Sequence, residues 1–507
     1  MSDILSGAGL IVAALASAAA ILLPPSRSRS AAMLAALILF PVLILGDQWH
    51  THQIVDLRES SGKLVALLAV GAIVVVALAA IFRRWPWLVP LAIVAALPFR
   101  VPLHSGGDTA NLLVPLYLVI GGAVVATALR DWTSPLPSRG RLQGPALWLP
   151  RLVALFVVLY ALQALYSDDF SKGLQNACFF LVPFTVAYAL LTDVDWDKRL
   201  LSWTLVLVAA EAVVFVLIGS VEYVSKELFW NDAVIRSNAF HTYFRVNSVF
   251  WDPNVYGRYL ALVLVVVTTA LLYVKERRPF WLLAGTILVL WIGLAQTFSQ
   301  SSFIALLAGL AVLAALRWSW RWTLAAVAVG AIGAVLVVIL IGGKGVNFDR
   351  INIDTSGRAD LVSGGLDLFA ERPLQGYGSG SFQRAYRQHR SERKAPVTIS
   401  HTEPITVAAE QGLVGLAAYA ALIVVAIWTM AAGMWARAPG RDPTILDAAR
   451  AAVLATFVAL LVHTLAYAGF IEDPITWVLL AIGASLTVQR VPDQADQGRR
   501  KRSVLCT

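Results

Sequence analysis

The chain has 507 residues, of which 58% are hydrophobic and 14% are charged, and its formal net charge is +9. In soluble domains about a quarter of all residues are usually charged. The lower charged fraction of this chain therefore excludes an ordinary soluble protein and indicates that lipid is the solvent. The positive charge does not require a nucleic-acid partner, since Lys and Arg accumulate on the cytoplasmic side of membrane proteins.

Apolar blocks follow one another along the chain, and most approach the ~20 residues with which a helix crosses a hydrocarbon core. We predict an all-α polytopic membrane protein with about 12–15 transmembrane helices, and we expect the first block to be a span and not a cleaved signal. The block at 87–99 is short and also fits a re-entrant segment. The blocks are residues 4–23, 31–46, 63–82, 87–99, 110–129, 149–166, 174–192, 200–219, 256–274, 281–297, 302–317, 322–341, 412–434, 447–467 and 475–489.

Basic residues occur in every second turn between these blocks, and this alternation predicts the orientation in the cytoplasmic (inner) membrane. We expect the basic turns and the C-terminus on the cytoplasmic side, and parity then places the N-terminus outside. The basic turns contain Arg27 and Arg29, Arg83 and Arg84, Arg139 and Arg141, Lys198 and Arg199, Lys275, Arg277 and Arg278, Arg317 and Arg321, and Arg437 and Arg441.

Two of the turns expected outside are long, and they divide the chain into five segments. The second is large and net positive, with nine Lys or Arg against six Asp or Glu between Gly342 and His401, which an anionic ligand would explain. The segments are N-terminal transmembrane helices at 1–199, central transmembrane helices at 200–341 with an outer loop at 221–254, a large extracytoplasmic catalytic loop at 342–402, C-terminal transmembrane helices at 403–489, and a basic cytoplasmic tail at 490–507.

The large loop contains signals for two short helices. Apolar residues recur at helical spacing between Arg358 and Pro373, and Pro373 is expected to end that helix. Gly376, Gly378 and Gly380 then require a tight turn. A second amphipathic helix is expected over Ser381–Arg393, where Arg384, Arg387, Arg390 and Arg393 form a basic stripe.

Arginine and histidine in this loop suit chemistry on a phosphorylated substrate. A guanidinium is permanently charged and binds two phosphate oxygens at once, which suits a pyrophosphate leaving group. An imidazole with a pKa near 6.5 can take a proton from an attacking hydroxyl, which suits a general base.

These features resemble the O-antigen ligase and O-antigen polymerase family of bacterial membrane glycosyltransferases. The shared elements are a Gly-Arg pair at Gly357-Arg358, a glycine-rich turn from Pro373 to Phe382, and a His followed by a small polar residue, a nine-residue spacer and Gly-x-x-Gly, from His401 to Gly415. Asp252-Pro253-Asn254 resembles a Pro-Asn element before an earlier span of the family. The resemblance covers the C-terminal part of the chain, from about residue 200.

The resemblance implies a metal-independent, inverting glycosyltransferase with a multi-span, GT-C-like fold and no cofactor. Its donor would be a glycan on a polyprenyl (undecaprenyl) pyrophosphate, and its acceptor a hydroxyl of a glycolipid, polysaccharide or protein in cell-envelope synthesis, for example of lipopolysaccharide. By the same resemblance, Arg358 binds the pyrophosphate and His401 activates the acceptor. Where the family has Ser-Arg, however, this chain has Ser299-Gln300, and Arg258 or Arg245 is a candidate for the missing charge.

Several alternatives stay open on the sequence alone. A polymerase would extend the lipid-linked glycan itself, and a flippase would move it across the membrane. The residues expected to contact substrate also have ordinary explanations, since the glycines can serve the turn alone and the basic stripe can face solvent or lipid headgroups. Glu211 and His463 lie inside spans, where we expect buried helix–helix hydrogen bonds. The substrate-binding candidates are Gln300, Arg258, Asn254, Gly376, Gly378, Gly380 and Arg384.

Overall fold

The computed structural model of the chain describes most of the membrane helices and part of the large loop. The described residues are 3–49, 51, 55, 61–105, 108–133, 144–231, 234–236, 238, 243–325, 327–329, 358–389, 400, 402–434 and 444–487. Most of the predicted span at 322–341, Arg390 and Arg393 of the basic stripe, and the tail at 490–507 lie outside them.

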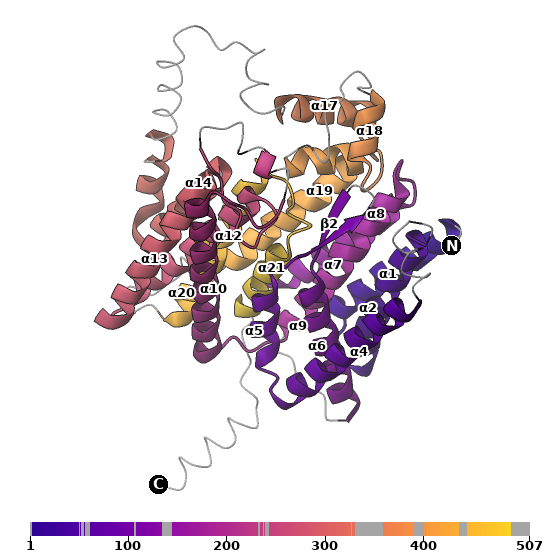
Figure 1. Cartoon of the computed structure of the whole chain (residues 1–507), viewed down its shortest axis with the longest axis horizontal. Helices are drawn as coiled ribbons and strands as arrows, with labels where there is room; N and C mark the ends of the chain where they lie inside the picture. The colour runs from indigo at the N-terminus through magenta and orange to yellow at the C-terminus, as the bar shows by residue number, and fades with distance from the viewer. Residues whose placement is uncertain are drawn as a thin grey trace.

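Within these residues the protein is almost entirely helical, and the prediction of an all-α polytopic membrane protein is confirmed (Figure 1). Eleven described helices are long and apolar enough to cross a membrane, and two shorter apolar helices accompany them. The exception is a hairpin of β1 (Val101–Ser105) and β2 (Asp108–Leu112), which pair antiparallel. The sequence analysis did not anticipate this hairpin.

The spans begin and end close to the predicted positions. The long ones are α1 (Asp3–Leu22), α2 (Arg27–Asp47), α4 (Ser61–Arg84), α6 (Val114–Thr133), a continuous run of α8 (Phe170–Asn176), η2 (Ala177–Leu181) and α9 (Val182–Thr192), α10 (Lys198–Ser225), α12 (Pro253–Tyr273), α13 (Arg277–Thr297), α14 (Gln300–Ala314) continued by η3 (Ala315–Ser319), α19 (Glu403–Ala431) and α20 (Ile445–Thr464). The two shorter apolar helices are α7 (Leu149–Ala164) and α21 (Pro474–Thr487), and the described part of the chain also contains the short segments α5 (Leu88–Ala96) and η1 (Gly144–Leu147).

Local sequence explains several of these helix starts. The Asp197 carboxylate accepts a hydrogen bond from the Leu200 amide at 2.7 Å and so caps α10. Asp252 caps α12 in the same way by accepting from the Asn254 amide at 2.6 Å, and Pro253 occupies the first helical position, where no amide donor is needed. Thr444 and Asp447 form a capping box at the start of α20.

The helices form two groups that share α19 and α21. The group on one side contains α1, α2, α4, α6, α7 and α9, and the other contains α10, α12, α13, α14 and α20 (Figure 1). Small residues allow close packing in the second group, because a Cβ at Gly257 of α12 would lie 2.6 Å from the Ser302 hydroxyl of α14. Likewise, a Cβ at Gly309 of α14 would lie 2.6 Å from a methyl of Val265.

Ionisable groups inside the described spans have protein partners. Arg29, expected in a basic turn, is 2% exposed, pairs with Asp193, and donates to the carbonyl of Ala189 at 2.9 Å. Glu211 accepts from the Tyr259 hydroxyl at 3.1 Å, so the predicted hydrogen bond between α10 and α12 is confirmed. These contacts explain how charged groups are tolerated in an apolar bundle.

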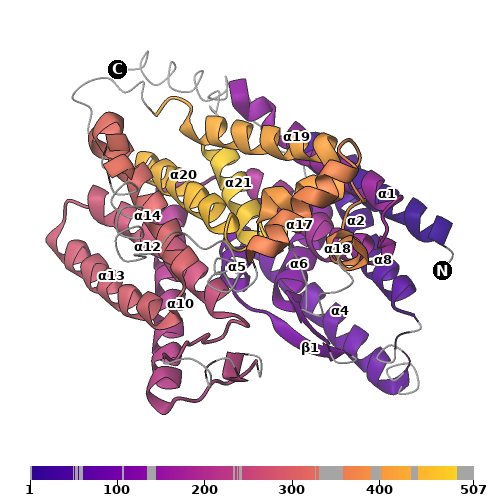
Figure 2. The same cartoon turned by 90° about the horizontal axis from the view of Figure 1, so that it is seen from above.

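Two short helices of the large loop lie together at one end of the bundle, which we call the loop end (Figure 1). They are α17 (Arg358–Glu371) and α18 (Phe382–His389). The prediction of two short helices separated by a turn that begins near Pro373 is confirmed, although the second is described only to His389. Seen from above, α17 lies beside the first part of α19 (Figure 2).

Candidate functional site

The glycine-rich turn between α17 and α18 is inserted into a break in α19. Gly412 has φ 62° and ψ −162°, which interrupts the helix and leaves backbone groups on both sides without helical partners. The turn bonds to these groups: the Leu413 amide donates to the Pro373 carbonyl at 2.7 Å, and the Gly378 amide donates to the Glu410 carbonyl at 2.7 Å. The two motifs that the sequence analysis treated separately therefore form one structural unit.

The glycines of this turn are required by both conformation and space. Gly376, Gly378 and Gly380 have φ of 68°, 92° and 81°, a region that other residues rarely adopt. A Cβ at Gly378 would lie 2.2 Å from the Cα of Ser167, and one at Gly380 would lie 2.5 Å from the Gly173 amide nitrogen. These contacts show that the three glycines form the turn. The role of the glycines in binding substrate stays a prediction.

Glu410 holds the turn to α19 and was missed by the sequence analysis. Its side chain is buried, and its two carboxylate oxygens accept from the amides of Gly380 at 2.8 Å and Phe382 at 3.0 Å. An acidic residue two positions before Gly412 in an apolar helix was the available signal, because a buried carboxylate requires hydrogen-bond donors.

A small apolar core fixes α17 and α18 on α19. It consists of Leu368, Tyr377, Phe382, Ala385, Tyr386 and Ala409, apart from the main core of the bundle. Two glycines of α17 make the contact close, since a Cβ at Gly364 would lie 2.3 Å from the Tyr386 ring and one at Gly365 would lie 2.4 Å from a methyl of Ile405. Arg384 points away from this core and is exposed on α18.

The two residues with predicted catalytic roles fall wholly or partly outside the described residues. His401 lies outside the described residues, and Arg358 begins α17 although its side chain also lies outside them. Their shared site stays a prediction.

Hydrogen bonds hold the segment that follows His401 against the connection between α20 and α21. The Thr402 hydroxyl donates to the Leu465 carbonyl at 3.0 Å, and the buried Glu403 carboxylate accepts from the amides of Gly469 at 2.8 Å and Phe470 at 3.2 Å. The start of α19 is therefore tied to residues 465–473, which connect α20 with α21.

Arg258, a substrate-binding candidate, is engaged by the same connection. It is 4% exposed, and its Nη2 lies 2.8 Å from a carboxylate oxygen of Asp473. A second cation is near, since burial lowers the pKa of Arg100 while Asp473 raises it and Arg258 lowers it further. Asp473 therefore pairs with the buried Arg258 and also acts electrostatically on the partly buried Arg100.

A polar network joins the starts of α12 and α14 to the end of α20. The Asn254 side-chain oxygen accepts from Arg245 Nη2 at 3.0 Å and from the Ser299 hydroxyl at 3.0 Å. His463 Nε2 lies 3.2 Å from the Ser301 hydroxyl and 3.4 Å from that of Ser302. The expected buried hydrogen bond of His463 is confirmed, and its partners belong to the Ser299–Ser302 motif.

Gln300 belongs to this motif by sequence but not by its contacts. It is the first residue of α14 and its side chain is exposed, while its neighbours Ser299, Ser301 and Ser302 are buried in the network. The alternation follows from the helical geometry, which points successive side chains in different directions.

An exposed group of ionisable residues lies beside the turn. His389 Nε2 is 2.5 Å from a carboxylate oxygen of Glu371 and 3.2 Å from the Tyr377 hydroxyl. A hydrogen bond from Tyr377 is the main cause that lowers the pKa of Glu371, whereas burial and this bond raise the pKa of Tyr377 to about 12. Arg372 stacks over the Tyr377 ring at 4.1 Å.

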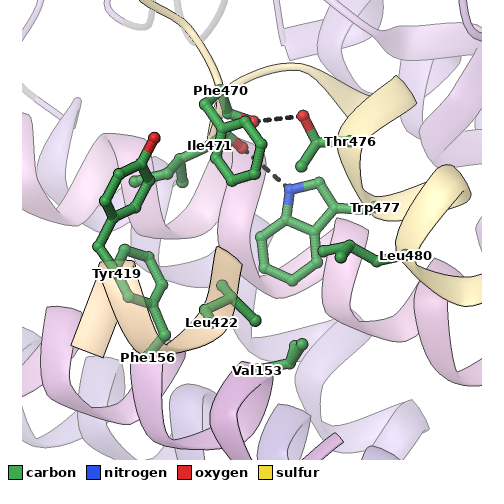
Figure 3. Close-up of a pocket in the computed structure, with 9 residues that line it drawn as sticks. All are labelled: Val153, Phe156, Tyr419, Leu422, Phe470, Ile471, Thr476, Trp477 and Leu480. Atoms are coloured by element: carbon green, nitrogen blue, oxygen red, sulfur yellow. Dashed lines mark hydrogen bonds between the residues drawn. The ribbon is translucent and has the colours of Figure 1, made fainter. Parts of the chain in front are cut away.

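Two small cavities adjoin the unit. One of about 10 Å³ is lined mainly by apolar side chains of α7, α19 and α21, and Trp477 beside it donates to the Ile471 carbonyl at 3.0 Å (Figure 3). The other, of about 40 Å³, is lined by Glu403, Glu410, Glu472 and other polar residues. Both are far smaller than the roughly 300–1,000 Å³ of typical ligand pockets, so neither holds a lipid-linked sugar.

The comparison with known families agrees with the resemblance noted in the sequence. Residues 285–420 match the family model described as O-Antigen ligase, a span that contains Ser299–Ser302, α17, the turn and the break in α19. No curated protein sequence matches the chain. Within the described ranges, no group of three or more His, Cys, Asp or Glu is placed to hold a metal ion.

Proposed function

We propose that this chain, whose residues 285–420 match the O-antigen ligase family model, moves a glycan from a polyprenyl pyrophosphate carrier to an acceptor hydroxyl. The match supports a part in glycan assembly at a membrane. The carrier, the acceptor, the inverting course and the independence from metals are the proposed refinements.

The observation that carries the proposal is the agreement between the family match and the unit at the loop end. The matched region includes the turn, Glu410 and Gly412, which are joined by direct backbone and carboxylate hydrogen bonds. Residues before and after the match reach the same end, because Asn254 contacts Ser299 and the connection at 465–473 holds Glu403. A fold that gathers these motifs supports a common site.

In the proposed reaction the acceptor oxygen attacks C1 of the donor sugar while the bond from C1 to the pyrophosphate oxygen breaks. His401 takes the proton of the acceptor hydroxyl. The lipid pyrophosphate leaves with the bonding electrons, and Arg358 stabilises the charge that develops on it. Attack opposite to the leaving group inverts the configuration at C1.

A polymerase is the second candidate, since the sequence resembles both ligases and polymerases, which would differ in their acceptor. A flippase is less well supported. It would need polar groups along a path through the spans, whereas Arg29 and Glu211 within the described helices are engaged by Asp193 and Tyr259.

Purified protein incubated with lipid-linked repeat units separates these functions. A ladder of longer lipid-linked chains without added acceptor indicates a polymerase, and transfer only onto an added acceptor indicates a ligase. We expect His401→Ala to abolish either product while the protein inserts normally and keeps its melting temperature. Normal transfer by that variant would contradict the catalytic assignment.

A further inference from the structure

Arg245 has the properties of a second pyrophosphate ligand, in a chain that has glutamine where the family resemblance expects an arginine. We propose that Arg245 binds a phosphate oxygen of the lipid-linked donor and thereby supplies the charge missing at Gln300. This inference rests on the proposed function, because it names a residue for the same donor.

The backbone of Arg245 is fixed on both sides. Its amide donates to the Asn238 side chain at 3.1 Å, and the Asn238 amide group donates back to the Arg245 carbonyl at 3.0 Å. The next residue, Val246, donates to the Gln296 carbonyl at 3.3 Å. The loop before α12 therefore holds Arg245 against the end of α13.

The guanidinium is oriented by two neutral acceptors. Nε donates to the Thr297 carbonyl at 2.9 Å, and Nη2 donates to the Asn254 side-chain oxygen at 3.0 Å. Phe298, with φ 49°, ends α13 in a left-handed conformation and leaves the Thr297 carbonyl outside the helical hydrogen bonds. The Nη1 group has no protein acceptor, and no carboxylate pairs with Arg245, in the part of the chain that the structure describes.

A half-buried guanidinium with a net positive charge and unused donors is suited to an anion. Its two partners orient the fork without neutralising it, so binding a phosphate would cost little side-chain entropy. Partial exposure also leaves a route for a ligand. These three properties distinguish a binding arginine from one that only holds the fold together.

Arg258, the other candidate for the missing charge, has an unused donor in its buried Nη1 but lacks the other two properties. It is 4% exposed and already paired with Asp473 at 2.8 Å. A donor phosphate would have to displace that carboxylate in a buried environment, where breaking an ion pair is costly. The structure therefore favours Arg245 over Arg258.

The position of Arg245 also explains how its charge can replace one at residue 300. The Asn254 side-chain oxygen accepts from both the Arg245 guanidinium and the Ser299 hydroxyl. Asn254 therefore links Arg245 to Ser299, the residue directly before Gln300. Gln300 is exposed at the start of α14. An arginine introduced there would extend from the same small region.

The test is a charge exchange between the two positions, with four variants of the full-length protein: Arg245→Gln, Gln300→Arg, their combination, and Arg236→Gln. Arg236 is an exposed arginine of the same loop and serves as the matched control. Binding of undecaprenyl pyrophosphate, binding of undecaprenyl phosphate, and KM and kcat with the lipid-linked glycan are measured in detergent, together with the melting temperature.

We expect Arg245→Gln to weaken binding of the pyrophosphate by about 10- to 100-fold, the usual effect of losing a charge-assisted contact, and Arg236→Gln to change it by less than about twofold. The combined variant should regain most of the lost affinity even if its melting temperature stays low, which a purely structural role of Arg245 would not produce.

Two outcomes count against the inference, and they are distinguishable. If wild-type protein transfers glycan and Arg245→Gln binds the pyrophosphate equally well, Arg245 is not a ligand although the proposed function stands. If wild-type protein neither binds undecaprenyl pyrophosphate nor transfers glycan from it, the proposed function fails and the inference fails with it.

Discussion

Two buried carboxylates, Glu410 and Glu403, hold the loop end together by accepting hydrogen bonds from backbone amides. Glu410 has no basic partner in the described structure and accepts backbone amides instead. Glu403, one position after Thr402, does the same with the amides of Gly469 and Phe470. Each carboxylate joins segments that are distant in sequence, and together they connect the turn, α19 and the connection between α20 and α21.

Glu410→Ala should detach the glycine-rich turn from α19. The substitution leaves the amides of Gly380 and Phe382 without an acceptor, at about 1–3 kcal/mol for each buried group. We expect a lower melting temperature and faster proteolysis within residues 372–389. Glu227→Gln, at an exposed site, should change neither quantity. Unchanged proteolysis of Glu410→Ala would show that other contacts suffice to hold the turn.

The same residues show which parts of the site sequence can predict. Pro373 and the three turn glycines were predicted correctly as helix end and turn because their effect on the backbone is local. Glu410, Arg245 and His463 acquire their meaning from partners that lie far away in the sequence. His463, for example, meets Ser301 across 162 positions, and no spacing rule links two such residues.

At the scale of elements, hydropathy located most spans to within a few residues but missed the first part of α19 and the internal irregularities of the helices. The apolar block predicted at 412–434 is part of a helix that already starts at Glu403 and is broken at Gly412. Polar residues between 403 and 411 hid this first part, because they face protein and not lipid. The β1–β2 hairpin was missed for a similar reason, as its short strands carry no strong alternation of polar and apolar residues.

The pairing of α17 with α18 should weaken in acid. Tyr377 and His389 lower the pKa of Glu371 below its ordinary value of 4.5. A carboxylate whose pKa is lower in the folded than in the unfolded protein stabilises the folded state at pH values above its unfolded-state pKa. This stabilisation disappears as the pH falls through the pKa of the carboxylate in the folded protein. Wild-type protein should therefore melt at a higher temperature than Glu371→Gln at pH 7, and the difference should vanish as the pH falls below the folded pKa of Glu371. A difference that does not depend on pH would assign the effect of Glu371 to packing.

At the scale of the whole molecule, the N-terminal and central groups of helices meet through α19 and α21, and the loop end lies above this junction. The connection at 465–473 is the common element, since it contacts the start of α19 and contains Asp473, the partner of Arg258 in α12. The position of the segment next to His401 relative to α12 therefore depends on one buried ion pair and a few backbone hydrogen bonds.

Breaking that ion pair should be more harmful than removing it. Asp473→Asn leaves the buried Arg258 charge without compensation, which costs about 3–5 kcal/mol in comparable pairs, whereas removing both charges is often nearly neutral. We expect Asp473→Asn to lower the melting temperature strongly and Arg258→Met combined with Asp473→Asn to recover much of the loss. A double-mutant cycle on melting in detergent measures the coupling. Additive effects would show that Arg258 and Asp473 are stabilised independently, and the connection at 465–473 would then not be the element that fixes α19 relative to α12.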